Sequence, residues 1–163
     1  MADAEYEAHL AELRKLYVEA TPRQRYGMGR NRIKNPEHGP NVLVACVSAV
    51  EGLARSLAMH QDALSRVKAP EVKAELAAIY PQYKRKGAEE LIEQYLKGVG
   101  LPGPSQYFGE ATWERLHYAI AYRNVLAHEC TYLGQDRSPA LIEACQEVLH
   151  KLAAAGGLKV VDA

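Results

Sequence analysis

The sequence has no surplus of charge of either sign, because Lys+Arg and Asp+Glu both number 20 among its 163 residues. Net charge therefore does not indicate a nucleic-acid partner, and any electrostatic recognition has to come from local clustering. The three cysteines, Cys46, Cys130 and Cys145, are odd in number and widely separated, with no C-x-x-C pair. This usage favours a reducing compartment and predicts neither a disulfide framework nor a zinc site.

Targeting segments and cofactor motifs are also missing. The N-terminal stretch MADAEYEAHL is acidic, so no secretory signal is expected. The longest apolar run, VLVACVSAV, contains a serine and is followed by Glu51, which predicts that it is too short and too polar to span a bilayer. We therefore expect a cytoplasmic protein with no membrane partner. No H-x-x-x-H pair, G-x-S-x-G motif or Gly-rich phosphate loop occurs, so no metal and no cofactor are predicted.

Strand-like alternation is essentially absent, and helical periodicity runs through most of the chain. Helices are predicted over about residues 3–20, 42–67, 70–79, 87–99, 110–129 and 139–155. Asn41 and Ser138 are the expected N-caps of two of them. The stretches PRQRYGMGRNRIKNPEHGP and LPGPSQYFG are predicted to be loops. The expected fold is a single domain over 1–163, an all-α up-down bundle of four to five principal helices.

The helix expected over 110–129 has an apolar stripe that we place by geometry. A helix advances 100° per residue, so Trp113, Leu116 and Ala127 lie within about 40° of Ile120. These four residues form the predicted core-facing stripe.

Three polar residues border that stripe within AYRNVLAHEC. Arg123 lies about 60° to one side of Ile120, and Asn124 and His128 lie about 40° and 80° to the other. Asn124 and His128 are four residues apart, so the amide oxygen can accept from the imidazole and fix its tautomer. The alternative is structural: the helix dipole favours a histidine near the C-terminus, and an arginine can lie along apolar surface with its methylenes.

The stretch YRNVLAHE resembles the signature of the HEPN superfamily. In that signature an arginine, often followed by a polar residue, precedes a histidine by four to six residues, late in a helix of an all-α bundle. Arg123, Asn124 and His128 match it one by one, and VLVACVSAVEGLARSLA resembles the long preceding helix of those domains. The likeness extends over residues 5–155. It implies a metal-independent endoribonuclease of a defence or toxin–antitoxin system, acting as a homodimer around a shared cleft.

The resemblance also implies roles for the matched residues. His128 is the expected general base or acid, Arg123 the residue that holds phosphate oxygens, and Asn124 the orienter. Because one chain supplies one histidine, a two-fold dimer would supply an acid and a base together. RNA is the implied substrate, and an antitoxin or larger defence-system protein is a further implied partner. One HEPN toxin group has a tyrosine two residues after the histidine; here that position is Cys130, which separates this chain from that group.

A basic stretch lies between Thr21 and Pro36, within the loop predicted over 21–40, and it contains no acidic residue. Its candidate RNA-binding residues are Arg23, Arg25, Tyr26, Arg30, Arg32 and Lys34. The cations would hold phosphates and the tyrosine would stack on a base. The alternative is an ordinary solvated loop.

Two residues of the second predicted helix, Glu51 and Arg55, are candidates for the lining of the cleft. The alternative is a simple i,i+4 ion pair. Two other functions fit the whole sequence: a non-catalytic HEPN module that binds RNA or nucleotides, and a helical protein-interaction domain in which the motif is structural.

Overall fold

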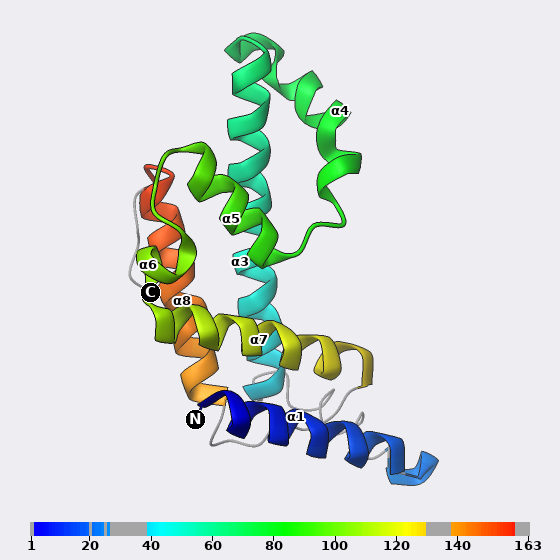
Figure 1. Cartoon of the computed structure of the whole chain (residues 1–163). Coiled ribbons are helices and arrows are strands. Elements are labelled where there is room, and N and C mark those ends of the chain that lie inside the picture. Colours follow the sequence, from blue (N-terminus) through cyan, green and yellow to red (C-terminus); the bar gives the residue numbers. More distant parts are fainter. Residues whose placement is uncertain (1, 20, 25, 27–38, 130–137, 159–163) are drawn as a thin grey trace. The chain divides into compact units, whose positions relative to one another are not determined.

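The computed structural model describes residues 2–19, 21–24, 26, 39–129 and 138–158, and within them the chain is helical with no strand (Figure 1). The predicted all-α helical bundle is confirmed. The elements in chain order are α1 (Ala2–Glu19), α3 (Gly39–Arg66), the 3-10 turn η1 (Ala69–Glu71), α4 (Val72–Tyr83), α5 (Ala88–Gly98), α6 (Pro104–Phe108), α7 (Glu110–Glu129) and α8 (Ser138–Ala155).

Several predicted helix ends differ from the structure, two of them by three residues or more. Helix α8 begins at Ser138 itself, so Ser138 is its first helical residue and not the predicted N-cap. Helix α3 begins at Gly39, so Asn41 lies inside its first turn and is not its N-cap. Helix α4 does not end at Ile79 but continues past Pro81 to Tyr83. The turn after the proline is intact, since the amide of Lys84 donates to the carbonyl of Tyr80 at 3.0 Å.

Part of each predicted loop is helical. In α6 the amide of Tyr107 donates to the carbonyl of Gly103 at 2.8 Å, and Phe108 is buried. At the start of the basic stretch, the amide of Thr21 donates to Oε1 of Gln24 at 2.8 Å, and the amide of Gln24 donates to Oγ1 of Thr21 at 3.2 Å. This reciprocal pair is a capping box, and it starts a helical turn at Pro22.

The chain divides into two compact units, each made of two segments. The first unit is Met1–Val47 with Arg115–Cys145, and the second is Ser48–Glu114 with Gln146–Ala163. Helices α3, α7 and α8 each contribute residues to both units. The prediction of one domain over 1–163 stays a prediction.

Each unit has its own set of buried apolar side chains. The first unit buries Leu10, Leu13, Leu43, Val47, Leu116, Ala119, Tyr122, Leu126, Leu141 and Cys145. The second unit buries Val50, Ala54, Ala58, Ile79, Leu91, Ile92, Leu96, Phe108, Val148 and Leu152. Each fully buried leucine, isoleucine or valine stabilises the fold by about 1.5–3 kcal/mol relative to an exposed one.

Residues 41–66 of α3 are long and apolar enough to cross a membrane by length and composition alone. The prediction that VLVACVSAV is too short and too polar to span a bilayer therefore does not extend to the whole of α3. Its fully buried residues recur every three or four positions along one face, at Leu43, Val47, Val50, Ala54 and Ala58. That one-sided pattern is typical of a helix packed in a protein core, which satisfies the same test of length and composition. The cytoplasmic location stays a prediction.

Candidate functional site

Helix α7 carries the motif, and the residues that it buries differ from the predicted stripe. Its buried side chains are Leu116, Tyr118, Ala119, Tyr122 and Leu126. The centre of this face lies about 120° around the helix axis from Ile120. Of the predicted stripe only Leu116 is fully buried, whereas Trp113 and Ile120 are half-buried and Ala127 is exposed.

Two tyrosines account for the difference of about 120° between the observed buried face of α7 and the predicted one. Periodicity treats tyrosine as a border residue, yet its ring contributes as much buried apolar area as a large aliphatic side chain. Tyr118 and Tyr122 are 3% and 0% exposed, and both contact α1, which lies beside α7 in the first unit (Figure 1). The core-facing side of α7 is therefore the side of its tyrosines.

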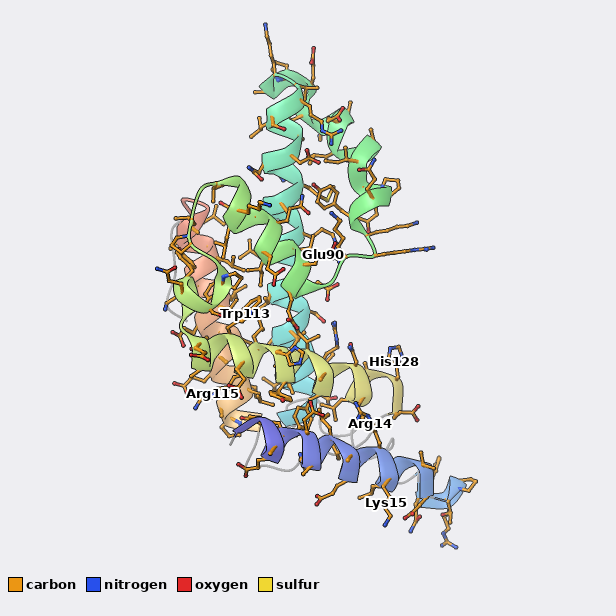
Figure 2. All side chains as sticks on the ribbon, viewed as in Figure 1. Arg14, Lys15, Glu90, Trp113, Arg115 and His128 are labelled. Atoms are coloured by element: carbon orange, nitrogen blue, oxygen red, sulfur yellow. The ribbon has the colours of Figure 1, made fainter. Side chains whose placement is uncertain are left out.

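The rotation changes where the three motif residues point. Arg123 lies about 60° from the centre of the buried face, whereas Asn124 and His128 lie about 160° from it. The observed burial agrees, since Arg123 is half-buried and both Asn124 and His128 are exposed. In Figure 2 His128 lies at the end of α7, with its ring directed away from α1.

The predicted partnership of Asn124 is replaced by another. Nε of Arg123 donates to Oδ1 of Asn124 at 3.0 Å. Among the described residues no hydrogen bond joins Asn124 to His128, so the amide does not fix the imidazole tautomer there. In the structure Asn124 is instead hydrogen-bonded to the guanidinium of the neighbouring arginine.

His128 itself lies in the last turn of α7, and within the described part of the chain it has neither a hydrogen bond nor an ion pair. The imidazole is accessible to solvent, and a general acid or base must be able to reach its substrate in this way.

The candidate RNA-binding residues are only partly described. Arg23 is exposed in the capped turn, and Tyr26 is 68% exposed. Arg25, Arg30, Arg32 and Lys34 lie outside the described residues, as do Cys130 and Tyr132. Arg14 of α1, to which periodicity assigned no role, is a further exposed cation of the first unit and projects from the α1 side that faces α7 (Figure 2).

Glu51 and Arg55 belong to the second unit. They form the i,i+4 ion pair that was predicted as the alternative to lining the cleft. Nη2 of Arg55 lies 2.8 Å from Oε1 of Glu51. The same guanidinium donates to the carbonyls of Tyr83 at 3.2 Å and Lys86 at 2.9 Å. Arg55 thus binds the carbonyl of the last residue of α4 and one in the segment that follows it, a structural role. Their lining of a cleft stays a prediction.

The sequence pattern gave no role to a cluster of aromatic and polar side chains between α1 and α7. The hydroxyl of Tyr122 lies 2.7 Å from Nδ1 of His9. The ring of Tyr6 stacks on that of Tyr118, with centroids 4.6 Å apart, and meets Tyr122 edge-on at 6.2 Å. The only sequence signal is the spacing, since Tyr6 and His9 are three residues apart and the two tyrosines of α7 are four apart.

Neither the acidic groups nor the described thiols indicate metal or redox chemistry. Within the described segments no group of three or more His, Cys, Asp or Glu side chains is placed to hold a metal ion. Burial raises the pKa of Cys46, and burial followed by the nearby Cys46 raises the pKa of Cys145 to about 12. Thiols with raised pKa values are poor nucleophiles at neutral pH.

The chain was compared with known protein families, curated proteins and solved structures. No protein-family model, curated protein or solved structure matches the chain. The resemblance to the HEPN superfamily therefore depends on the residues of YRNVLAHE and on the all-α fold that surrounds them.

Proposed function

We propose that this protein is a metal-independent endoribonuclease in which Arg123 and His128 act in a cleft completed by a second copy of the chain. The proposal depends on the resemblance of YRNVLAHE to the HEPN signature. It is supported by the place of the motif at the exposed end of a long helix in an all-α fold.

The observation that favours a composite site is the angle between the two side chains. Arg123 and His128 are five residues apart, which places them about 140° apart around the axis of α7. Two side chains that diverge in this way do not readily grip one phosphate from a single helix. A second α7 related by a two-fold axis brings the arginine of one copy towards the histidine of the other.

The chemistry follows from the residue types. The 2′-hydroxyl of the RNA loses its proton to a neutral imidazole, and its oxygen forms a bond to the adjacent phosphorus. The bond from phosphorus to the 5′-oxygen breaks, and an imidazolium gives that oxygen a proton. The products are a 2′,3′-cyclic phosphate and a 5′-hydroxyl. The guanidinium of Arg123 stabilises the charge that develops on the phosphoryl oxygens.

The first test is cleavage of end-labelled RNA by the purified protein in EDTA. We expect His128→Ala to lower the rate by about 10²–10⁴-fold, because it removes a proton-transfer group. His150→Ala is the matched control, since His150 is an exposed histidine of α8. Equal cleavage by wild type and His128→Ala, or no cleavage by either, contradicts the proposal.

Mixing two inactive variants tests the composite site. In a mixed dimer of Arg123→Ala and His128→Ala chains, an intact arginine and an intact histidine come from different copies. We expect activity to reappear on mixing if the cleft is shared. Two separate sites, each within one chain, would leave the mixture as inactive as its components.

Two outcomes identify the alternative functions. RNA that binds without turnover, with an affinity whose salt dependence weakens on removing Arg23, indicates a non-catalytic module. A lower unfolding midpoint of His128→Ala with no RNA binding in either protein indicates a structural motif in an interaction domain.

A further inference from the structure

We infer that His9 of α1 is a positioning residue for the candidate site, acting through Tyr122 on the motif end of α7. The inference rests on the proposed function, and it concerns a residue outside the motif and outside the basic stretch. Three observations carry it: the burial of Tyr122, its bond to His9, and its place in the chain next to Arg123.

The first observation is that the hydroxyl of Tyr122 belongs to a buried side chain. The side chain is fully buried, and a buried hydroxyl without a hydrogen bond costs about 1–3 kcal/mol. Nδ1 of His9 lies at 2.7 Å from it. A neutral imidazole can accept from the hydroxyl at Nδ1 while its own proton stays on Nε2. The bond therefore gives this buried hydroxyl a hydrogen-bond partner.

The rings around this bond restrict the rotation of α7 against α1. Tyr6 stacks on Tyr118 at 4.6 Å and meets Tyr122 edge-on at 6.2 Å, while the ring of His9 lies 5.5 Å from that of Tyr122. Stacking tolerates small slides, whereas a hydrogen bond of this length has a narrow range of angle. The bond between His9 and Tyr122 is thus a more sharply directional restraint on the rotation of α7 than these ring contacts.

Rotation of α7 is what directs the motif. Tyr122 and Arg123 are neighbours, so their side chains keep a fixed angle of about 100° around the helix axis. Any turn of the helix that lengthens the bond to His9 turns Arg123, and His128 one and a half turns further on, by the same angle. The orientation of both motif residues relative to the rest of the first unit is therefore tied to a residue of α1.

The chain offers matched variants for a test. Tyr122→Phe keeps the ring and removes only the hydroxyl, and His9→Leu removes the imidazole. His9→Asn is the conservative variant, because an asparagine oxygen is two bonds from Cβ, as Nδ1 is. Tyr118→Phe is the control, since its hydroxyl makes a longer contact, 3.4 Å to Oε1 of Glu7.

RNA cleavage is measured for each variant well below its unfolding midpoint, with folding checked by circular dichroism. We expect Tyr122→Phe and His9→Leu each to lower kcat by about tenfold, with a smaller change in KM, because a displaced catalytic group slows the chemical step. The double variant should be no slower than either single one, since both remove the same bond. His9→Asn should recover most of the rate, and Tyr118→Phe should resemble wild type.

The outcomes separate the inference from the proposed function. If His128→Ala is inactive while folded Tyr122→Phe and His9→Leu keep the wild-type kcat, the inference is overturned and the nuclease stands. If wild type itself does not cleave RNA, the proposed function fails, and side-chain NMR decides the inference. Displaced resonances of Arg123 Nε–H and the His128 ring in Tyr122→Phe, but not in Tyr118→Phe, then support positioning. Unchanged resonances in both variants overturn it.

Discussion

The hydroxyl of Tyr83 donates a 2.8 Å hydrogen bond to Oδ2 of Asp62, which joins the last turn of α4 to α3. Tyr83 also accepts from Nε2 of Gln94 at 2.6 Å, so its hydroxyl links three helices of the second unit. Lys86 completes the network, with Nζ 2.9 Å from Oε1 of Gln94 and 4.6 Å from the centre of the Tyr83 ring. Helix α4 buries only Ile79 and Tyr83, so this polar network accounts for much of its attachment.

Tyr83→Phe should lower the free energy of unfolding by about 1–3 kcal/mol, because it leaves Asp62 and Gln94 without their shared partner. Urea denaturation followed by circular dichroism gives the value. Tyr80→Phe is the matched control, since Tyr80 lies on the same helix and is 49% exposed. Its effect should stay within about 0.5 kcal/mol. Equal losses for the two variants would show that the network contributes nothing.

The buried thiol of Cys145 predicts a loss of stability at alkaline pH. Burial raises its pKa from 9.0 to about 12, so the folded protein keeps the proton longer than the unfolded chain does. The stabilisation is complete below the unfolded pKa and is lost as pH rises through about 12.

The measurement compares the free energy of unfolding at neutral pH and at about pH 10.5, between the two pKa values. Cys145→Ala should show a smaller drop than wild type. Cys46→Ala, which removes a half-buried thiol, should keep most of the wild-type drop. In the folded protein at neutral pH, Cys145 should also be unreactive towards a disulfide reagent. Rapid modification of Cys145, or equal drops in all three proteins, would contradict this account.

Gly109 joins α6 to α7 in a conformation that disfavours other residues. Its φ is 93° and its ψ is 142°, a region that side chains with a Cβ rarely adopt. Gly109→Ala should therefore cost about 1–3 kcal/mol of unfolding free energy, even though the added methyl meets no atom within 4 Å. Gly103→Ala is the control, since Gly103 has a φ of −62° and equally open space. The idea fails if both variants melt at the same temperature.

The bond between Arg123 and Asn124 predicts which motif residue depends on the amide. If Asn124 acts on Arg123, Asn124→Ala should slow RNA cleavage in the wild-type background but not in Arg123→Ala. It should still slow the residual cleavage of His128→Ala, because that background keeps the arginine. Single-turnover rates of six proteins, namely wild type, the three single variants and the two double variants with Asn124→Ala, provide the two cycles. The reverse pattern, with additivity only in Arg123→Ala, would restore the amide as the partner of His128.

The helix bounds that depend on local patterns were predicted well, and those that depend on contacts with distant residues were not. The bounds of α7 match the predicted 110–129, and α8 ends at the predicted Ala155, because periodicity and capping are local properties. The short helix α6 was predicted to be a loop, since five residues are too few for a periodic pattern. It forms where Pro104 starts a turn and Phe108 finds a buried position in the second unit. Helix α4 continues past Pro81, although a proline removes one intrahelical hydrogen bond and its ring crowds the carbonyl four residues earlier.

The sequence by itself determined that the chain is all-α and that Arg123, Asn124 and His128 lie near the end of one helix. Helical periodicity and residue order suffice for both statements, since neither depends on distant contacts. Only the tertiary structure decided which side of α7 is buried. A tyrosine faces the core when a partner elsewhere in the chain satisfies its hydroxyl, and for Tyr122 that partner is His9, 113 residues away. Asn124 and His128 lie on the side of α7 opposite to Tyr122 and are exposed, and no pattern within α7 contains the distant contact.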